Sequence, residues 1–182
     1  TGAVNLTGAG TVALGNTCGV TGAVDNTSGE AGVGTLTGTG AGTTVVTGNI
    51  GATNALGTIS HDGTGTFQLD GTVAATTITE TAGATFDVGG NVTGNVNLAG
   101  GGTLDLAGGA NLTGALNNTS GADDSGFLVL GGAHTISGAV GATNSLNEIT
   151  LNGAASAVAF GSTVASTDIT FAATSAVTLN GN

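Results

Sequence analysis

The side chains that could do chemistry in this chain are eleven carboxylates, two histidines and one cysteine. Paired carboxylates would suit glycoside hydrolysis, which needs two acids facing each other across a cleft. Only Asp123 and Asp124 are adjacent, and most other acids stand alone, in outward-pointing positions between apolar neighbours or in turns. Lysis of acidic polysaccharides needs a cation beside the substrate carboxylate, but the chain has no Lys or Arg. The sequence therefore predicts no catalytic residues and no enzyme activity.

Metal and cofactor binding find little support in the same residues. Asp123 and Asp124 are weak candidates for a surface calcium ion, which prefers oxygen ligands. His61 is predicted to end a strand with its ring half buried or hydrogen-bonded, and His134 to be an exposed loop or strand-start residue. The two histidines share no motif and no Cys-x-x-Cys is present, so no transition metal and no cofactor are expected.

A repeat of roughly 91 residues organises the chain that must position these groups. Residues 1–92 and 93–182 are two versions of one unit, in which TGAVDNTSG at 21–29 returns as TGALNNTSG at 113–121. Repetition over such a distance is typical of solenoids, in which each coil buries its face against its neighbours.

The alignment of the two repeats assigns roles to several unusual residues. Cys18 falls opposite Ala110, so we predict a small buried filler rather than a reactive thiol. Asp123 and Asp124 fall opposite an Ala-Gly pair and are predicted to lie in an insertion loop.

A shorter pattern, apolar–x–apolar followed closely by Gly, predicts strands with one buried face and sharp corners. Sustained helical spacing is absent, and Gly, Thr and Val lower helix propensity. We therefore predict an all-β chain forming a single parallel β-helix of about nine coils, each of roughly 18 to 24 residues. The alternative, an antiparallel sandwich or barrel, would not need distant near-copies. The predicted core comprises Val12, Leu14, Phe67, Leu69, Phe86, Val88, Leu104, Leu106, Leu128, Leu130, Ile149, Leu151, Val158, Phe160, Val177 and Leu179.

Composition excludes several partner classes. The formal charge is −11 without a single Lys or Arg, which argues against nucleic-acid binding and against anionic membrane surfaces. No apolar run reaches about 18 residues, so membrane insertion is not expected. Disorder is disfavoured because 39% of the residues are hydrophobic and regularly spaced.

The blocks at 21–29 and 47–59, with their copies at 113–121 and 137–149, resemble the passenger repeats of bacterial outer-membrane autotransporters. The likeness is greatest to the large rickettsial surface-antigen type and runs over essentially the whole chain. It implies a right-handed β-helix, extracellular and displayed on a bacterial cell surface. There it would act as an adhesin or structural stalk, with a host or cell-surface receptor as a possible partner.

An alternative hypothesis is a subunit of an extracellular filament. A β-helix has open ladder edges at both ends, and such edges invite strand pairing. Segment 1–6 repeats 93–98, and the chain ends at 180–182, where the next unit would begin. The expected partners are then neighbouring repeats or identical subunits stacked end to end.

Overall fold

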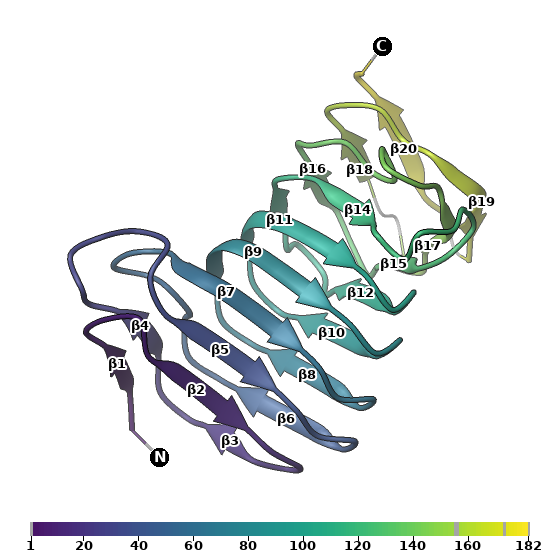
Figure 1. Cartoon of the computed structure of the whole chain (residues 1–182). Helices are drawn as coiled ribbons and strands as arrows, with labels where there is room; N and C mark the ends of the chain where they lie inside the picture. The colour runs from purple at the N-terminus through teal and green to yellow at the C-terminus, as the bar shows by residue number, and fades with distance from the viewer. Residues whose placement is uncertain (1, 155–156, 173, 182) are drawn as a thin grey trace.

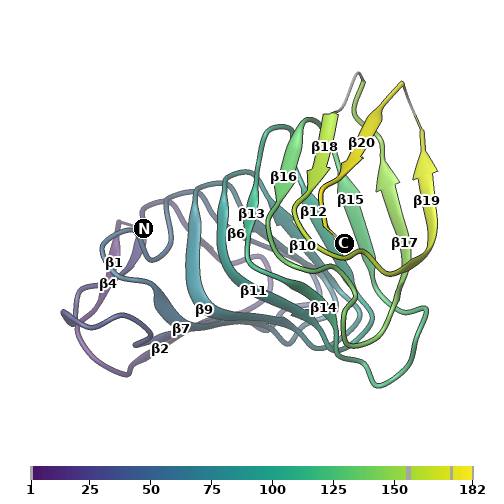
Figure 2. The same ribbon diagram turned by 90° about the horizontal axis from the view of Figure 1, so that it is seen from above.

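The computed structural model describes residues 2–154, 157–172 and 174–181, and these residues form β-strands and no helix. The chain winds as a solenoid of about nine coils in which all paired strands run parallel (Figure 1). Its two ends lie at opposite ends of the stack (Figure 2). The predicted parallel β-helix is confirmed. Thr1 and Asn182, at the two predicted stacking ends, lie outside the described residues.

Two long sheets run the length of the solenoid. The eight-stranded sheet has the order β19 (Ser166–Phe171), β17 (Leu146–Leu151), β15 (Phe127–Leu130), β12 (Thr103–Leu106), β10 (Thr85–Val88), β8 (Thr66–Leu69), β6 (Thr43–Val46) and β3 (Gly19–Val20). The ten-stranded sheet has the order β2 (Thr11–Leu14), β5 (Thr35–Gly38), β7 (Leu56–His61), β9 (Val73–Glu80), β11 (Val92–Leu98), β13 (Leu112–Thr113), β16 (His134–Ile136), β18 (Ala157–Phe160) and β20 (Ala176–Leu179), with β14 (Leu116–Asn118) also paired to β11. A separate pair joins β1 (Val4–Leu6) to β4 (Val24–Asn26).

Apolar side chains stack over one another in the interior because equivalent positions of successive coils are paired in register. One such column runs Val4, Val24, Ile50, Val73, Val92, Leu112, Ile136 and Phe160. Burial of this surface, at about 25 cal/mol per Å², and the backbone ladder between coils hold the stack together.

Thirteen of the sixteen predicted core residues are buried, and the other three lie in the terminal coils. The core prediction is wrong for Leu179, which is 61% exposed. Val12 and Val177 are only partly buried and pack against the edge of the core. The physical reason is shared: these side chains point inward, but the first and last coils are covered on one side alone.

The backbone itself repeats between the two halves of the chain. Gly51 and its equivalent Gly141 have φ values of 66° and 67°. At another such pair, Gly32 has φ 79° and its equivalent Asp124 has φ 59°. Left-handed φ is easy for glycine and tolerated by Asp, so the corner survives the substitution.

The two repeats occupy different faces of the solenoid, a face being one of the three sides along which strands stack. In the first repeat β2, β5, β7 and β9 lie in the ten-stranded sheet, whereas their equivalents β12, β15, β17 and β19 lie in the eight-stranded sheet. The opposite switch occurs in the next strand of each coil. The strands β3, β6, β8 and β10 lie in the eight-stranded sheet, whereas their equivalents β13, β16, β18 and β20 lie in the ten-stranded sheet. The second repeat is therefore turned about the long axis by one face.

The length of the repeat explains this turn. Register carries Val4 through four coils to Val92, but the sequence equivalent of Val4 is Val96, one face further along the coil. The unit thus contains four coils and one additional face. Outward rows of side chains consequently change face from one unit to the next.

Glycines of successive coils stack on one another at the corners of the solenoid. The corner at which they stack also moves by one face from the first repeat to the second. A Cβ at Gly71 would lie 2.6 Å from the carbonyl oxygen of Gly48 one coil before, so side chains are excluded there. In the second repeat a Cβ at Gly114 would meet the backbone of Gly94, at the next corner. Close approach of one coil to the next is the reason for glycine at these positions.

Candidate functional site

The two calcium candidates, Asp123 and Asp124, lie exposed in the loop before β15. The Ser145 amide donates to Asp123 Oδ1 at 3.1 Å, and the Ser145 hydroxyl donates to Asp124 Oδ1 at 2.9 Å. Thr167, from the following coil, also donates its hydroxyl to Asp124. These hydrogen bonds, that from Thr167 foremost, hold the pKa of Asp124 below its usual value. Through these hydrogen bonds the two aspartates link three successive coils.

Within the described ranges, no three His, Cys, Asp or Glu side chains come close enough together to hold a metal ion. A calcium ion at the Asp123–Asp124 loop stays a prediction from the sequence.

His61 is fully buried at the end of β7, so the prediction of a half-buried or hydrogen-bonded ring is wrong. Its ring lies 5.7 Å from the ring of Phe67 and 5.8 Å from that of Phe86. Neither ring nitrogen has a hydrogen-bond partner in the described part of the chain. The repeat alignment places His61 opposite the core residue Leu151, and this was the signal for an apolar site.

Burial lowers the pKa of His61 from its ordinary value of 6.5, because the surrounding core disfavours the imidazolium. The carboxylates of Glu80 and Asp62 and the carbonyl of Gly40 oppose this effect without reversing it. Folding therefore favours the neutral ring.

Replacing His61 with Leu is expected to raise the free energy of unfolding by about 1–2 kcal/mol, because two unsatisfied buried nitrogens are removed. The wild type should also lose stability as the pH falls below about 6.5, since the unfolded chain takes up the proton more readily there. Urea unfolding over a pH series would measure both effects. A wild-type pH dependence that persists undiminished in the Leu variant would contradict the assignment.

Glu80, at the end of β9, is also fully buried, which corrects the expectation that isolated acids point outward or lie in turns. Its Oε1 accepts the amides of Ala82 at 2.6 Å and Ala84 at 2.8 Å. Its Oε2 accepts the amide of Gly102, in the next coil, at 3.0 Å. The carboxylate thus ties together two turns at the boundary of the repeats. Its equivalent, Phe171, is apolar, which was the available signal.

A buried asparagine, which the sequence analysis did not predict, occurs once in each repeat. Asn26 donates to the carbonyl oxygens of Glu30 and Ala55 at 2.7 and 2.9 Å. Asn118 donates to those of Ala122 and Ser145, both at 2.7 Å. In each case a serine two residues later donates to the asparagine Oδ1. The repeated Asn-x-Ser sequence was the signal, and its role is to close a loop.

Acidic side chains also form a short row on an outer face. Asp87 of β10 and Asp105 of β12 are in register on adjacent strands. Partial burial, then the charge of Asp87, raises the pKa of Asp105. Partial burial, then the charge of Asp70, raises the pKa of Asp87. The carboxylates stand side by side along one sheet rather than across a cleft, which is not the glycosidase arrangement.

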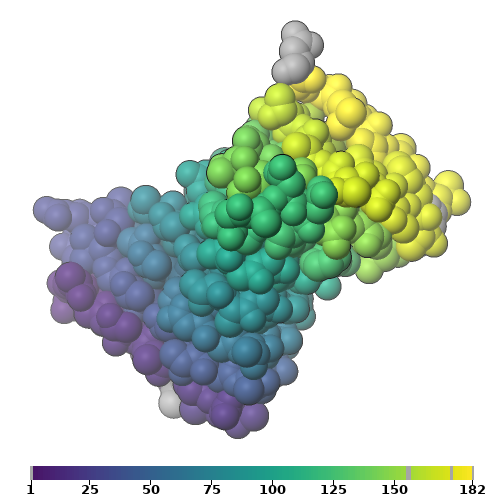
Figure 3. Space-filling model, turned by 45° about the vertical axis from the view of Figure 1, so that its right-hand side comes forward, coloured from purple at the N-terminus to yellow at the C-terminus, as the bar shows by residue number. Residues whose placement is uncertain are grey.

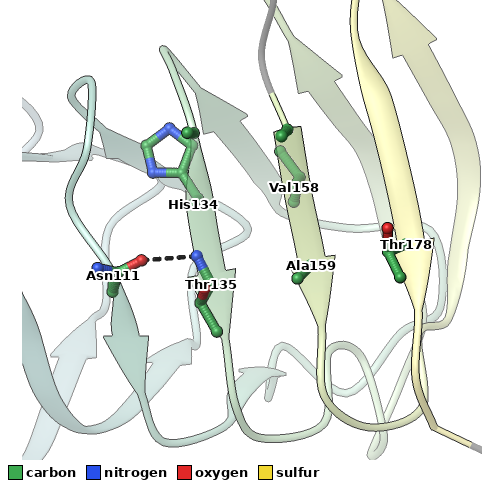
Figure 4. A pocket seen from close by; sticks show the side chains of 8 residues that line it. Asn111, His134, Thr135, Val158, Ala159 and Thr178 are labelled. Atoms are coloured by element: carbon green, nitrogen blue, oxygen red, sulfur yellow. Dashed lines mark hydrogen bonds between the residues drawn. The ribbon is translucent and has the colours of Figure 1, made fainter.

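An open groove of about 310 Å³ lies beside β16, β18 and β20 (Figure 4). His134 lines it and is only 3% exposed, so the prediction of an exposed residue is wrong although it does begin a strand. Its Nδ1 lies 2.5 Å from the carbonyl oxygen of Ala110, and its Nε2 accepts the amide of Gly132 at 2.8 Å. This pattern requires the proton on Nδ1. Because both ring nitrogens are bonded to backbone groups, the ring links two successive coils.

Searches of protein-family models, curated proteins and solved structures find no match to this chain. Among the described residues, no helix is long and apolar enough to cross a bilayer. Any proposal about function therefore depends on the chain's own sequence and geometry.

Cys18 is exposed, so the prediction of a buried filler is wrong. Its equivalent, Ala110, is 2% exposed and lies in an interior coil, where its carbonyl oxygen contacts His134 Nδ1. Cys18 lies in the first coil, where no preceding coil covers it.

Proposed function

We propose that this chain is a rigid, non-catalytic stalk of an extracellular, surface-displayed β-solenoid. The observation that carries this proposal is the use of its buried polar side chains. Glu80 binds the backbone of the next coil, and Asn118 and His134 bind backbone carbonyls of neighbouring coils. Groups that could have formed a reactive site instead brace the stack.

The ladder supports this role mechanically. In a solenoid each coil contacts only its neighbours, so a load along the axis passes from coil to coil through parallel strand pairs. The extracellular location rests on the resemblance of the repeats to autotransporter passengers, and the formal charge of −11 favours solubility of a displayed rod.

A stalk must hold its ends at a fixed separation, and this can be measured between spin labels. Cys18 is exposed beside β3, at one end of the eight-stranded sheet, and Thr170→Cys would place a second label in β19 at the other end. Seven strand spacings of about 4.8 Å predict a narrow distance distribution near 34 Å, apart from the length of the labels. A broad distribution in the dilute, doubly labelled Thr170→Cys protein would rule out the stalk. A core-disrupted variant, Leu104→Asp, is the control expected to broaden it.

A further inference from the structure

Two columns of short polar side chains run along β5, β7, β9 and β11, which lie side by side facing the viewer in Figure 1. The members of each column are in register from one coil to the next. The first column comprises Thr35, Thr58, Thr77 and Asn95, and the second comprises Thr37, Ser60, Thr79 and Asn97. We call these two columns the polar face.

Alternation along each strand directs the polar face outward. The residue between the two members on each strand is buried in the core, as Leu36, Ile59, Ile78 and Val96. The members themselves are half-buried or exposed. In the space-filling view the coils of the first repeat, from purple to teal, pack against one another without an opening between them (Figure 3). The polar groups are therefore presented together on one outer surface of closely packed coils.

The β-sheet sets the distances between the members of the polar face. Neighbours in one column are about 4.8 Å apart, and the two members on one strand are about 6.6 Å apart. The side chains are also stiff, because β-branched threonine has restricted rotation about χ1. Ser60 donates its hydroxyl to Thr37 Oγ1 at 3.0 Å, which fixes two further groups. The polar face is thus a preformed two-dimensional lattice of hydroxyl and amide groups.

Unequal coil lengths hide this lattice in the sequence. Successive members of a column are 18 to 23 residues apart, so they follow no constant period along the chain. The register between coils nevertheless supplies one member of each column per coil.

Folding does not require short polar residues at these positions. In the second repeat Val129 stands in place of Thr37, and Glu148 stands in place of Thr58. The buried residues between the members are leucine or isoleucine in both of these strand pairs. A requirement of the coil itself would act on both repeats, so the lattice of the first repeat is consistent with selection for a ligand.

The polar face is uncharged, whereas the other long sheet carries acids. The outward pairs of β8, β10 and β12 are Thr66 with Gln68, Thr85 with Asp87, and Thr103 with Asp105. A single threonine column there stands beside a column of Gln and Asp. The ligand that complements the polar face is therefore itself uncharged and periodic in two directions.

We propose that the polar face binds the surface of ice crystals, a function that goes beyond the stalk proposed above. Water molecules recur in the planes of ice at distances similar to the two spacings of the polar face. Each water molecule both donates and accepts hydrogen bonds, as the threonine and serine hydroxyls do. Crystalline polysaccharides are also periodic and uncharged, but their sugar rings pack well on aromatic side chains, which the polar face lacks.

Rigidity gives this surface its affinity. A single hydroxyl binds water weakly, but groups held in one lattice bind an ice plane simultaneously, so their contributions combine. Because the side chains are already ordered by the sheet, little conformational entropy is lost on binding. The β-solenoid therefore supplies the preorganisation that a contact with a crystal needs.

Ice-affinity measurements on matched variants test the proposal. Thr58→Tyr and Thr35→Tyr each place a large ring in the lattice, whereas Thr66→Tyr makes the same change on the eight-stranded sheet. Tyrosine is favourable in strands, and circular dichroism spectra establish that each variant folds. Polycrystalline ice is grown slowly from a dilute protein solution, and the protein concentrations in the ice and in the remaining liquid are compared. We expect the wild type and Thr66→Tyr to be enriched in the ice, and Thr58→Tyr and Thr35→Tyr to remain in the liquid.

Three outcomes would overturn the proposal. They are exclusion of the wild type from growing ice, equal enrichment of the wild type and both polar-face variants, and retention of the wild type on crystalline cellulose or chitin without enrichment in ice. None of them would alter the narrow spin-label distance expected of a rigid stalk, so the two proposals can fail separately.

Discussion

Replacing Leu104 with Asp is expected to lower the free energy of unfolding by about 5 kcal/mol, the largest effect of any single substitution considered for this protein. Leu104 is 1% exposed and lies in register between Phe86 and Leu128 on the adjacent coils. The substitution removes a buried apolar side chain and places a carboxyl group in a dry core. Urea unfolding followed by circular dichroism measures the change.

The matched control for this substitution is Thr113→Asp, which adds the same charge at an exposed position in the next coil. We expect its free energy of unfolding to change by no more than about 0.5 kcal/mol. If the two variants unfolded at the same urea concentration, the inward orientation of Leu104 would be refuted.

Replacing Glu80 with Ala is expected to cost about 3–5 kcal/mol, because three buried backbone amides lose their acceptor. The amides of Ala82, Ala84 and Gly102 would then be left without the carboxylate that now binds them. Glu80→Gln keeps one oxygen but places an NH₂ group against an amide donor, so an intermediate loss is expected.

Hydrogen exchange gives a local measurement for the Glu80 variants. Protection of the Ala82, Ala84 and Gly102 amides should fall in Glu80→Ala, whereas amides in distant coils should follow only the change in global stability. If Glu80→Ala and Glu80→Gln were both as stable as the wild type, the carboxylate would not be bracing these turns.

Glu80 lies at the junction between the two repeats. It ends β9, the strand that pairs with the first strand of the second repeat. The carboxylate therefore joins the two repeats at the point where the structure turns by one face.

Local sequence patterns were enough to predict the all-β class, the coiled repetition and most of the core. Alternation of inward and outward side chains is a local property of a strand, so the inward positions of Leu104, Leu128 and Ile149 could be read from short patterns. Glycine within the strand pattern at Gly48 likewise predicted a bend or a close backbone approach, and in the structure a Cβ there would meet the backbone of Gly22 one coil before.

The buried positions of His61, Glu80 and His134 could not be predicted from local sequence patterns. Their environments depend on which side chains of other coils lie above and below them, and those neighbours are about twenty residues or more away in sequence. Register between coils also decided the one-face turn between repeats, since it depends on how many residues each coil contains. Leu179 and Cys18 are exposed for a similar reason: burial in a solenoid needs a coil on both sides, and each of these residues lies in a coil that the structure shows covered on one side alone.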